Sequence, residues 1–213
     1  MKIAVYSGSF NPLHIGHQAI MEFLTKERDF DWVYLVVSPQ NPFKDASNAK
    51  TGRERYEAAV KAVCRHPELH VWVDDIELNM PPPQYTIKTL DALKEREPEN
   101  DFTLVIGADN LQSIHGWRDF SRILTDYGVA VYPRKGYDID TLKKDLLEEC
   151  MRHPSPYVLD YTEEESPEGM SSLEEVLQRS YNIEVLDAPI VDISSTQIRE
   201  GIAHGEDMSK YLM

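Results

Sequence analysis

The chain has 213 residues, of which 41% are hydrophobic and 28% charged, as is ordinary for a globular protein with a substantial core. Its net charge of −15 argues against a general nucleic-acid or anionic-membrane binder, because such proteins need a broad basic surface. No apolar run approaches the ~20 residues of a membrane span and no signal-peptide layout opens the chain, so we expect a cytoplasmic protein.

Short apolar runs alternate with segments whose apolar residues recur at helical spacing. The predicted strands are Lys2 to Ser7, Trp32 to Val37, His70 to Val73, Phe102 to Ile106, Val129 to Tyr132 and Ile183 to Leu186. The predicted helices are Gln18 to Lys26, Arg53 to Arg65, Ile87 to Arg96, Tyr137 to Met151, and one that begins at Ser194 or Ser195 and runs toward Gly205. This alternation predicts an α/β fold with a doubly wound parallel sheet, whose ligands bind beyond the carboxyl ends of the strands.

Two stretches between these elements are predicted loops. Gln40 to Gly52 shows no helical or strand periodicity, which predicts a loop that could cover a binding site. Thr162 to Ser172 contains three consecutive glutamates and is typical of a solvated acidic surface. The two cysteines, Cys64 and Cys150, stand far apart, and we expect two buried or inert thiols rather than a disulfide.

The segment GSFNPLHIGH, residues 8–17, lies between the first predicted strand and the first predicted helix. A helix start offers unpaired backbone N–H groups and the positive end of the helix dipole, which favour phosphate. Pro12 suits the first helical turn, where its missing N–H costs little. His14 and His17 are three residues apart and so share one face of that turn. The segment therefore predicts a site for charge on phosphate.

Two histidines at this spacing also occur in metal half-sites and as ordinary polar surface residues. A metal site needs a third and usually a fourth ligand, and the neighbouring sequence offers no compelling partner. We therefore favour phosphate chemistry and assign no metal ligand in the protein.

The segment ISSTQIR, residues 193–199, is the second informative motif. Ser194 or Ser195 can cap a helix, with Arg199 one turn along as a cation for an anion at the helix start. The alternative is an ordinary capped helix with Arg199 in solvent, since serine and threonine caps are common.

Both motifs resemble signatures of the nucleotidylyltransferase superfamily, GxFxPxHxGH and ISSTxIR, and they stand in the order of that family. The resemblance spans essentially the whole chain and implies one Rossmann-like domain over residues 1–213, with the second motif completing the active site. It implies that His14 and His17 bind the triphosphate and stabilise the transition state of adenylyl transfer. The residues that it assigns to ATP are Gly8, Ser9, Phe10, His14, His17, Gly107, Asp109, Ser195, Thr196 and Arg199.

Four inner segments are similar to the nicotinate-mononucleotide adenylyltransferase branch: residues 37–44, 83–90, 106–117 and 132–137. In the first, Phe43 stands where the branch usually has His. The resemblance implies that Asp109 contacts a ribose hydroxyl, that Trp117 stacks on the pyridine ring and that Arg134 contacts the mononucleotide phosphate. A lone Trp is more often a core or surface filler. The residues assigned to the mononucleotide are Lys44, Tyr85, Thr86, Asp109, Trp117 and Arg134.

We therefore expect transfer of an adenylyl group from ATP to nicotinate mononucleotide, in NAD biosynthesis, with His14, His17, Lys44 and Arg199 as catalytic residues. Mg²⁺ is expected to be bound mainly through the ATP phosphates and water. Two alternatives stay open: an adenylyltransferase for nicotinamide mononucleotide or another phosphate acceptor, and a nucleotide-binding sensor that keeps the fold without the chemistry. The expected partners are these small molecules, with no nucleic acid and no membrane. The sequence does not determine the oligomeric state, including whether the chain forms a homo-oligomer.

Overall fold

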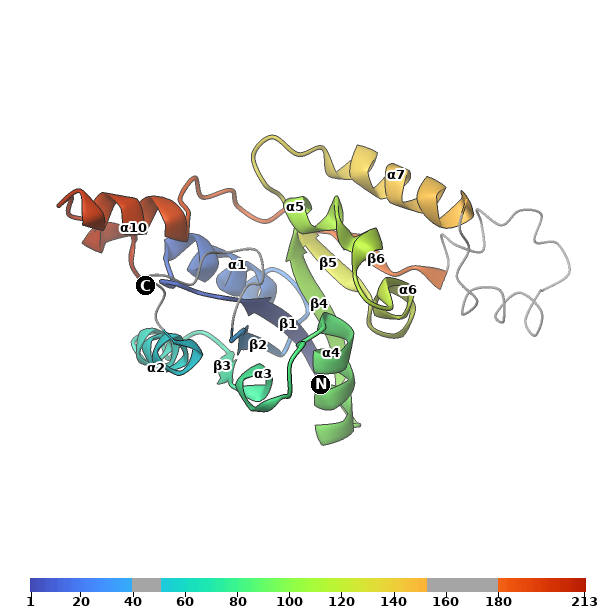
Figure 1. The fold of residues 1–213 in the computed structure, drawn as a ribbon, viewed down its shortest axis with the longest axis horizontal. Coiled ribbons are helices and arrows are strands. Elements are labelled where there is room, and N and C mark those ends of the chain that lie inside the picture. The colour runs from blue at the N-terminus through green and yellow to red at the C-terminus, as the bar shows by residue number, and fades with distance from the viewer. Residues whose placement is uncertain (40–50, 153–179) are drawn as a thin grey trace, which may run out of the picture.

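A parallel β-sheet with helices on both faces organises the chain in a computed structural model that describes residues 1–39, 51–152 and 180–213 (Figure 1). The strands are β1 (Lys2–Gly8), β2 (Trp32–Val37), β3 (Val71–Asp74), β4 (Asp101–Gly107), β5 (Val129–Tyr132) and β6 (Ile183–Val185). Their order is β3-β2-β1-β4-β5-β6, and every neighbouring pair is parallel. The predicted doubly wound α/β fold is confirmed.

Five longer helices connect or follow these strands. They are α1 (Ile15–Lys26), α2 (Gly52–Val63), α4 (Thr86–Arg96), α7 (Ile139–Arg152) and α10 (Ser195–Ala203). Short helical segments, which the sequence did not predict, are α3 (Ile76–Asn79), α5 (Ala108–Leu111), η1 (Ile114–Gly116), α6 (Phe120–Arg122), η2 (Ile123–Tyr127) and η3 (Ser209–Tyr211). None of the helices among the described residues is both long and apolar enough to cross a bilayer.

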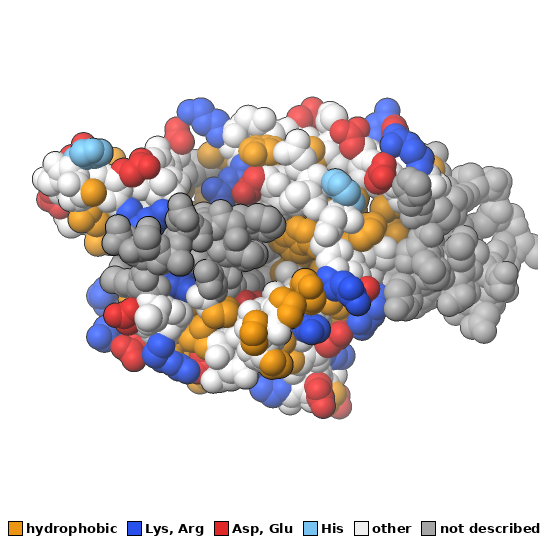
Figure 2. Space-filling view, viewed as in Figure 1, with side chains coloured by type: hydrophobic (Ala, Val, Ile, Leu, Met, Phe, Trp, Pro, Cys, Tyr) orange, Lys and Arg blue, Asp and Glu red, His pale blue; other side chains and the backbone are white. Residues whose placement is uncertain are grey.

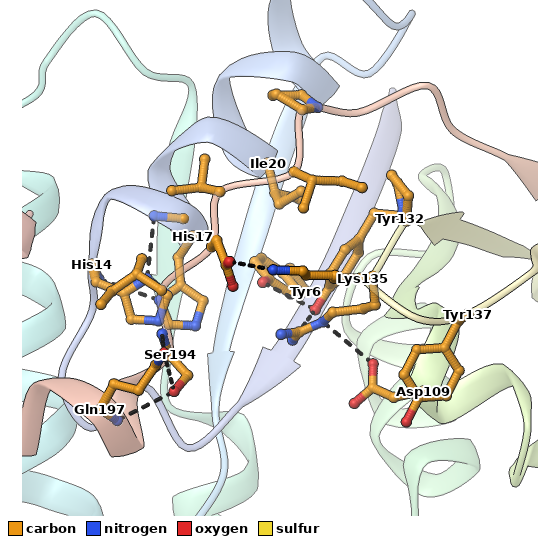
Figure 3. Close-up of a pocket in the computed structure, with 18 residues that line it drawn as sticks. Tyr6, His14, His17, Ile20, Asp109, Tyr132, Lys135, Tyr137, Ser194 and Gln197 are labelled. Carbon is orange, nitrogen blue, oxygen red and sulfur yellow. Dashed lines mark hydrogen bonds and ion pairs between the residues drawn. The ribbon is translucent and has the colours of Figure 1, made fainter. Parts of the chain in front are cut away.

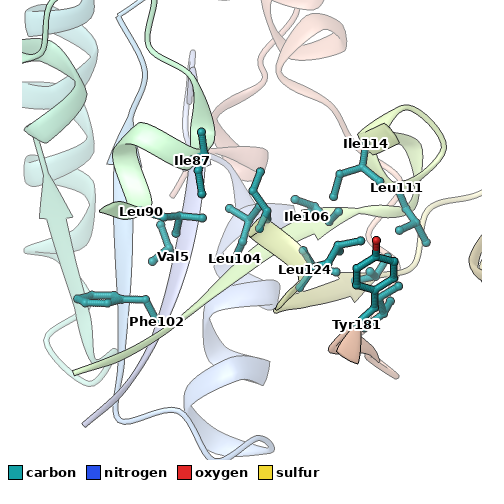
Figure 4. Packing of buried hydrophobic residues seen from close by; sticks show 14 of the residues in the cluster. Val5, Ile87, Leu90, Phe102, Leu104, Ile106, Leu111, Ile114, Leu124 and Tyr181 are labelled. Atoms are coloured by element: carbon teal, nitrogen blue, oxygen red, sulfur yellow. The ribbon is translucent and has the colours of Figure 1, made fainter. Parts of the chain in front are cut away.

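The strands are apolar on both sides because both faces of the sheet are covered. In β1, Ile3 and Val5 point into a cluster with Leu90 of α4, on the face shown from close by in Figure 4. The alternate residue Tyr6 points to the opposite cluster, which contains Met21 of α1. Acidic, basic and hydrophobic side chains are interspersed over the described part of the outer face shown in Figure 2.

The direction of winding reverses between β1 and β4, the two central strands. The segment after β1 leads into α1 on one face, while the segment after β4 leads into α5 on the other. Loops that diverge in this way leave a crevice at the carboxyl edge of the sheet, where α/β proteins bind ligands. Both the His14 segment and Gly107–Asp109 are therefore placed at this edge.

One local prediction needs correction. Helix α1 begins at Ile15, so Pro12 precedes the helix and is not part of its first turn. Both cysteines are free thiols, as expected, with Cys150 buried and Cys64 exposed. Two predicted loops fall largely or wholly outside the described residues. These are residues 40–50 of the predicted loop Gln40 to Gly52, and the whole acidic stretch Thr162 to Ser172. Gly52 belongs to α2.

Candidate active site

His14 and His17 stand ring against ring at the start of α1, with centroids 3.7 Å apart. His14 is the residue that caps the helix: its Nδ1 accepts a hydrogen bond from the backbone N–H of Gly16 at 3.2 Å. The Nδ1 of His17 accepts one from the backbone N–H of His14, also at 3.2 Å. Because each Nδ1 is an acceptor, we assign the proton of each neutral ring to Nε2. The pair therefore presents two Nε2–H donors.

These imidazole donors replace part of the expected backbone donor set. The sequence predicted unpaired N–H groups at the helix start, but the N–H of Gly16 is bonded to the His14 ring. The N–H of His17 is bonded to the backbone oxygen of His14 at 2.8 Å. At this helix start, an anion would therefore find its donors on the histidine side chains, because these two backbone N–H groups are already bonded.

His14 is buried and His17 is half-buried in the cavity wall, and the protonation of both rings follows from this loss of solvent. Burial, together with the positive charge of Arg134, lowers the pKa of His14 to about 4. Burial also lowers the pKa of His17 well below its usual value, with added repulsion from His14 and Arg134. Both rings are therefore neutral at pH 7 in the ligand-free protein, and each presents one donor without a positive charge.

A second group of polar residues faces the histidines across a cavity of about 280 Å³. In Figure 3, His14 and His17 lie on one side of this cavity, and Tyr132 and Asp109 lie on the other. The Nε of Arg134 is 3.3 Å from Oδ1 of Asp109, and its Nη2 donates a 3.0 Å hydrogen bond to the Tyr132 hydroxyl. This cluster brings together the ends of β4 and β5, as the topology requires.

Gly107 allows the side chains of Asp109, Arg134 and Tyr132 to come together. A Cβ on Gly107 would collide with Oδ1 of Asp109 and would lie 3.1 Å from both Nε of Arg134 and Cζ of Tyr132. The absence of a side chain at this position therefore permits the acid and the base to approach over the end of β4.

The third wall of the cavity comes from the C-terminal part of the chain. Ser194 caps α10, accepting a hydrogen bond from the backbone N–H of Gln197 at 3.2 Å, and both residues line the cavity. Lys135 and Asp192 form a 2.8 Å ion pair across the mouth, drawn as a dashed line in Figure 3. Both side chains are largely exposed, so this pair contributes little to stability.

The loop between β1 and α1 is held through its carbonyl oxygens. Arg199 donates to the oxygen of Asn11 at 2.7 Å, and the Ser195 hydroxyl donates to the oxygen of Pro12 at 3.0 Å. Arg55, from α2, donates to the oxygen of Ser9 at 2.6 Å. These bonds fix a loop that contains a strained residue, since Phe10 has φ 42°.

The predicted site residues divide into four groups. The cavity is lined by four of them: His14, His17, Asp109 and Arg134. Others lie beside it in the loops and in α10: Gly8, Ser9, Phe10, Gly107, Ser195, Thr196 and Arg199. Tyr85, Thr86 and Trp117 are not among the cavity-lining residues, although Thr86 does open α4 as expected. Trp117 is half-buried against the core, and Lys44 lies outside the described residues.

Sequence reasoning missed Tyr132 and Lys135 as lining residues, and Arg55 as a support of the loop. Tyr132 ends β5 and Lys135 follows it in the segment that carries Arg134, so their position at the carboxyl end of this strand was the available signal. Arg55 gave none, because an arginine in an amphipathic helix is usually exposed, whereas this one is 4% exposed. Within the part of the chain that the structure describes, no three His, Cys, Asp or Glu residues gather in a way that could hold a metal ion.

Comparison with known proteins gives consistent results. The cytidylyltransferase-like family model matches residues 5–201. A probable nicotinate-nucleotide adenylyltransferase of Flavobacterium johnsoniae is 32% identical, covering 100% of this chain and 92% of the relative. One of Bacteroides fragilis is 33% identical, covering 99% and 87%. A Plasmodium falciparum nicotinic acid mononucleotide adenylyltransferase complexed with NaAD superposes with TM-score 0.67 at 14% identity, covering 99% and 90%, which supports the fold.

Proposed function

Because the chain belongs to the cytidylyltransferase-like family, and within it to the nicotinate-nucleotide adenylyltransferases, we propose that it transfers the adenylyl group of ATP to nicotinate mononucleotide. The products are nicotinate adenine dinucleotide and pyrophosphate, a step of NAD biosynthesis. The observation that carries the proposal is that the His14 and His17 rings, each accepting a backbone hydrogen bond at Nδ1, share one cavity with Arg134. Such a cavity suits a reaction between two phosphates.

The reaction needs alignment and charge stabilisation more than acid–base chemistry. The mononucleotide phosphate is already an anion at neutral pH, so an oxygen of it attacks the α-phosphorus of ATP without a general base. The bond from the α-phosphorus to the bridging oxygen then breaks, and pyrophosphate leaves with the electron pair. Negative charge grows on the phosphoryl oxygens and the leaving group, and donors that are already oriented stabilise it.

The two histidines supply those donors. We assign His17 to the α-phosphate and His14 to the outer phosphates. Each ring is fixed through its Nδ1 by a backbone N–H, so neither has to reorient during the reaction. Arg199 and Lys44 are assigned to the charge of the leaving pyrophosphate. Arg199 has a second task, since it also holds the loop at Asn11.

The opposite wall is assigned to the mononucleotide. Arg134 would bind its phosphate, and Asp109 would accept a hydrogen bond from a ribose hydroxyl. The Oδ1 of Asp109 is buried and faces Arg134 at 3.3 Å, but accepts no hydrogen bond from any described residue. Tyr85, Thr86 and Trp117 are assigned to the nicotinate end on the resemblance of their segments, with Trp117 offering a flat face to the ring.

Magnesium is assigned to the substrate. As the family resemblance implies, Mg²⁺ would be bound mainly through ATP, by phosphate oxygens and water. When bound there it neutralises part of the triphosphate charge.

Pyrophosphate release with ATP and Mg²⁺ tests the proposal. The purified chain is assayed in parallel with nicotinate mononucleotide, nicotinamide mononucleotide and phosphopantetheine, and kcat/KM is compared. We expect a large preference for the nicotinate form. Preference for either other acceptor would overturn the substrate assignment, and no release with any of the three would overturn the activity.

A further inference from the structure

Two tyrosines form a buried pair in the cavity wall between the histidines and Arg134. Tyr6, from β1, and Tyr132, from β5, are 4% and 6% exposed. Their rings meet edge to face with centroids 5.9 Å apart, and the Tyr6 ring is also 6.1 Å from that of His17. Figure 3 shows Tyr6 between His17 and Tyr132. The pair therefore bridges the two walls of the cavity.

The hydrogen bonds of the Tyr132 hydroxyl leave its donor hydrogen unused. A tyrosine hydroxyl has one donor hydrogen and two acceptor lone pairs. That of Tyr132 accepts from Nη2 of Arg134 at 3.0 Å and, over a longer 3.4 Å, from the Tyr6 hydroxyl. Within residues 1–39, 51–152 and 180–213, nothing accepts its own hydrogen.

The direction of the Tyr6–Tyr132 contact follows from its geometry. The Tyr6 hydroxyl is the donor and the Tyr132 hydroxyl the acceptor, and Tyr132 is the partner of the Tyr6 hydroxyl among the described residues. If Tyr132 donated to Tyr6 instead, the buried hydrogen of Tyr6 would have no described acceptor, which is costly. The hydrogen of Tyr132 is therefore the one that remains for a ligand in the cavity.

Resting on the proposed function, we propose that the Tyr132 hydroxyl is a further binding group, donating a hydrogen bond to a phosphate oxygen of the mononucleotide that Arg134 binds. Its oxygen already lies 3.0 Å from the guanidinium, so an anion drawn to Arg134 brings an acceptor within its reach. The two acceptor bonds hold the hydroxyl in place before the ligand arrives, which lowers the entropic cost of the new bond.

Isosteric substitutions separate this role from packing. Tyr132→Phe removes the ligand donor and keeps the ring, whereas Tyr6→Phe removes the neighbouring hydroxyl and keeps the ligand donor. Three readouts are measured for the wild type and both variants: KM for nicotinate mononucleotide and for ATP, calorimetric binding of the mononucleotide without ATP, and inhibition by nicotinate riboside, which lacks the phosphate. Thermal unfolding of each variant controls for folding.

We expect Tyr132→Phe to raise KM and Kd for the mononucleotide ~10-fold or more, the range for a hydrogen bond to a charged group. KM for ATP and the Ki of the riboside should stay unchanged, and Tyr6→Phe should weaken mononucleotide binding less than about threefold, because a 3.4 Å contact is weak.

Equal effects of the two substitutions would overturn the proposal, since they would assign the effect to packing. A matching rise in the Ki of the riboside would also overturn it, because the hydroxyl would then contact the sugar or ring. If the wild type binds the mononucleotide without turning it over, the proposed function fails while calorimetry still decides the role of Tyr132. If the wild type does not bind it, both proposals fail.

Discussion

Acidification should destabilise this protein through His14, by an amount that follows from its burial. The pKa of a histidine is about 6.5 in an unfolded chain and about 4 for His14 in the fold. Between these values the unfolded state binds more protons, so the contribution of His14 is present above pH 6.5 and is lost as the pH falls toward 4. Linkage gives a loss of ~2 kcal/mol between pH 7 and pH 5.

The groups that face His14 act in the same direction. Arg134 is positive at every pH concerned and disfavours protonation of both imidazoles. The lowered pKa of His17 adds its own loss over the same interval, because burial opposes its charged form.

Urea unfolding at pH 7 and pH 5 measures the effect. His14→Asn removes the titrating group and keeps a side chain that caps helices well. His115→Asn, at an exposed position away from the cavity, is the matched histidine control. The wild type and the control should lose ~2 kcal/mol more than His14→Asn on acidification. Equal losses in all three proteins would refute the reasoning.

Three further outcomes are expected. His17→Ala should lower kcat ~100-fold or more, the usual effect of losing a donor to developing charge, and full turnover would remove His17 from the mechanism. Arg55→Met should cost ~2 kcal/mol or more in urea unfolding, since it strips donors from the backbone oxygens of Ser9 and Pro39; unchanged stability would contradict this. Binding of ATP near pH 5 should take up protons, because the negative triphosphate raises the pKa of His14 and His17. Calorimetry in two buffers of different ionisation enthalpy measures this uptake. Identical binding heats in the two buffers would show that no protons are taken up.

The sheet was predictable because its residues are apolar on both faces. β2 and β5 coincide with the predicted runs Trp32 to Val37 and Val129 to Tyr132, where no polar residue interrupts the pattern. The start of α1 was missed by three residues because its cap is a histidine, a residue outside the usual capping set. Propensity alone does not identify such a cap.

The site was predictable as motifs but not as contacts. His14 and His17 were paired from their spacing in one turn, and the 3.7 Å between their rings confirms that pairing. The cluster of Asp109, Arg134 and Tyr132 depends on the register of β4 against β5, which the sequence does not reveal. The neutrality of the histidines depends in the same way on burial, which is a property of the whole fold.

The bonds that hold the loop between β1 and α1 tie catalytic competence to completed folding. Arg199 is 188 residues from Asn11 along the chain, and Ser195 is 183 from Pro12. Contacts of such sequence separation close late, since the entropy of the intervening chain must be lost first. A refolding molecule can therefore regain its sheet while the loop still fluctuates. Recovery of turnover after dilution from urea should lag behind recovery of the circular dichroism signal.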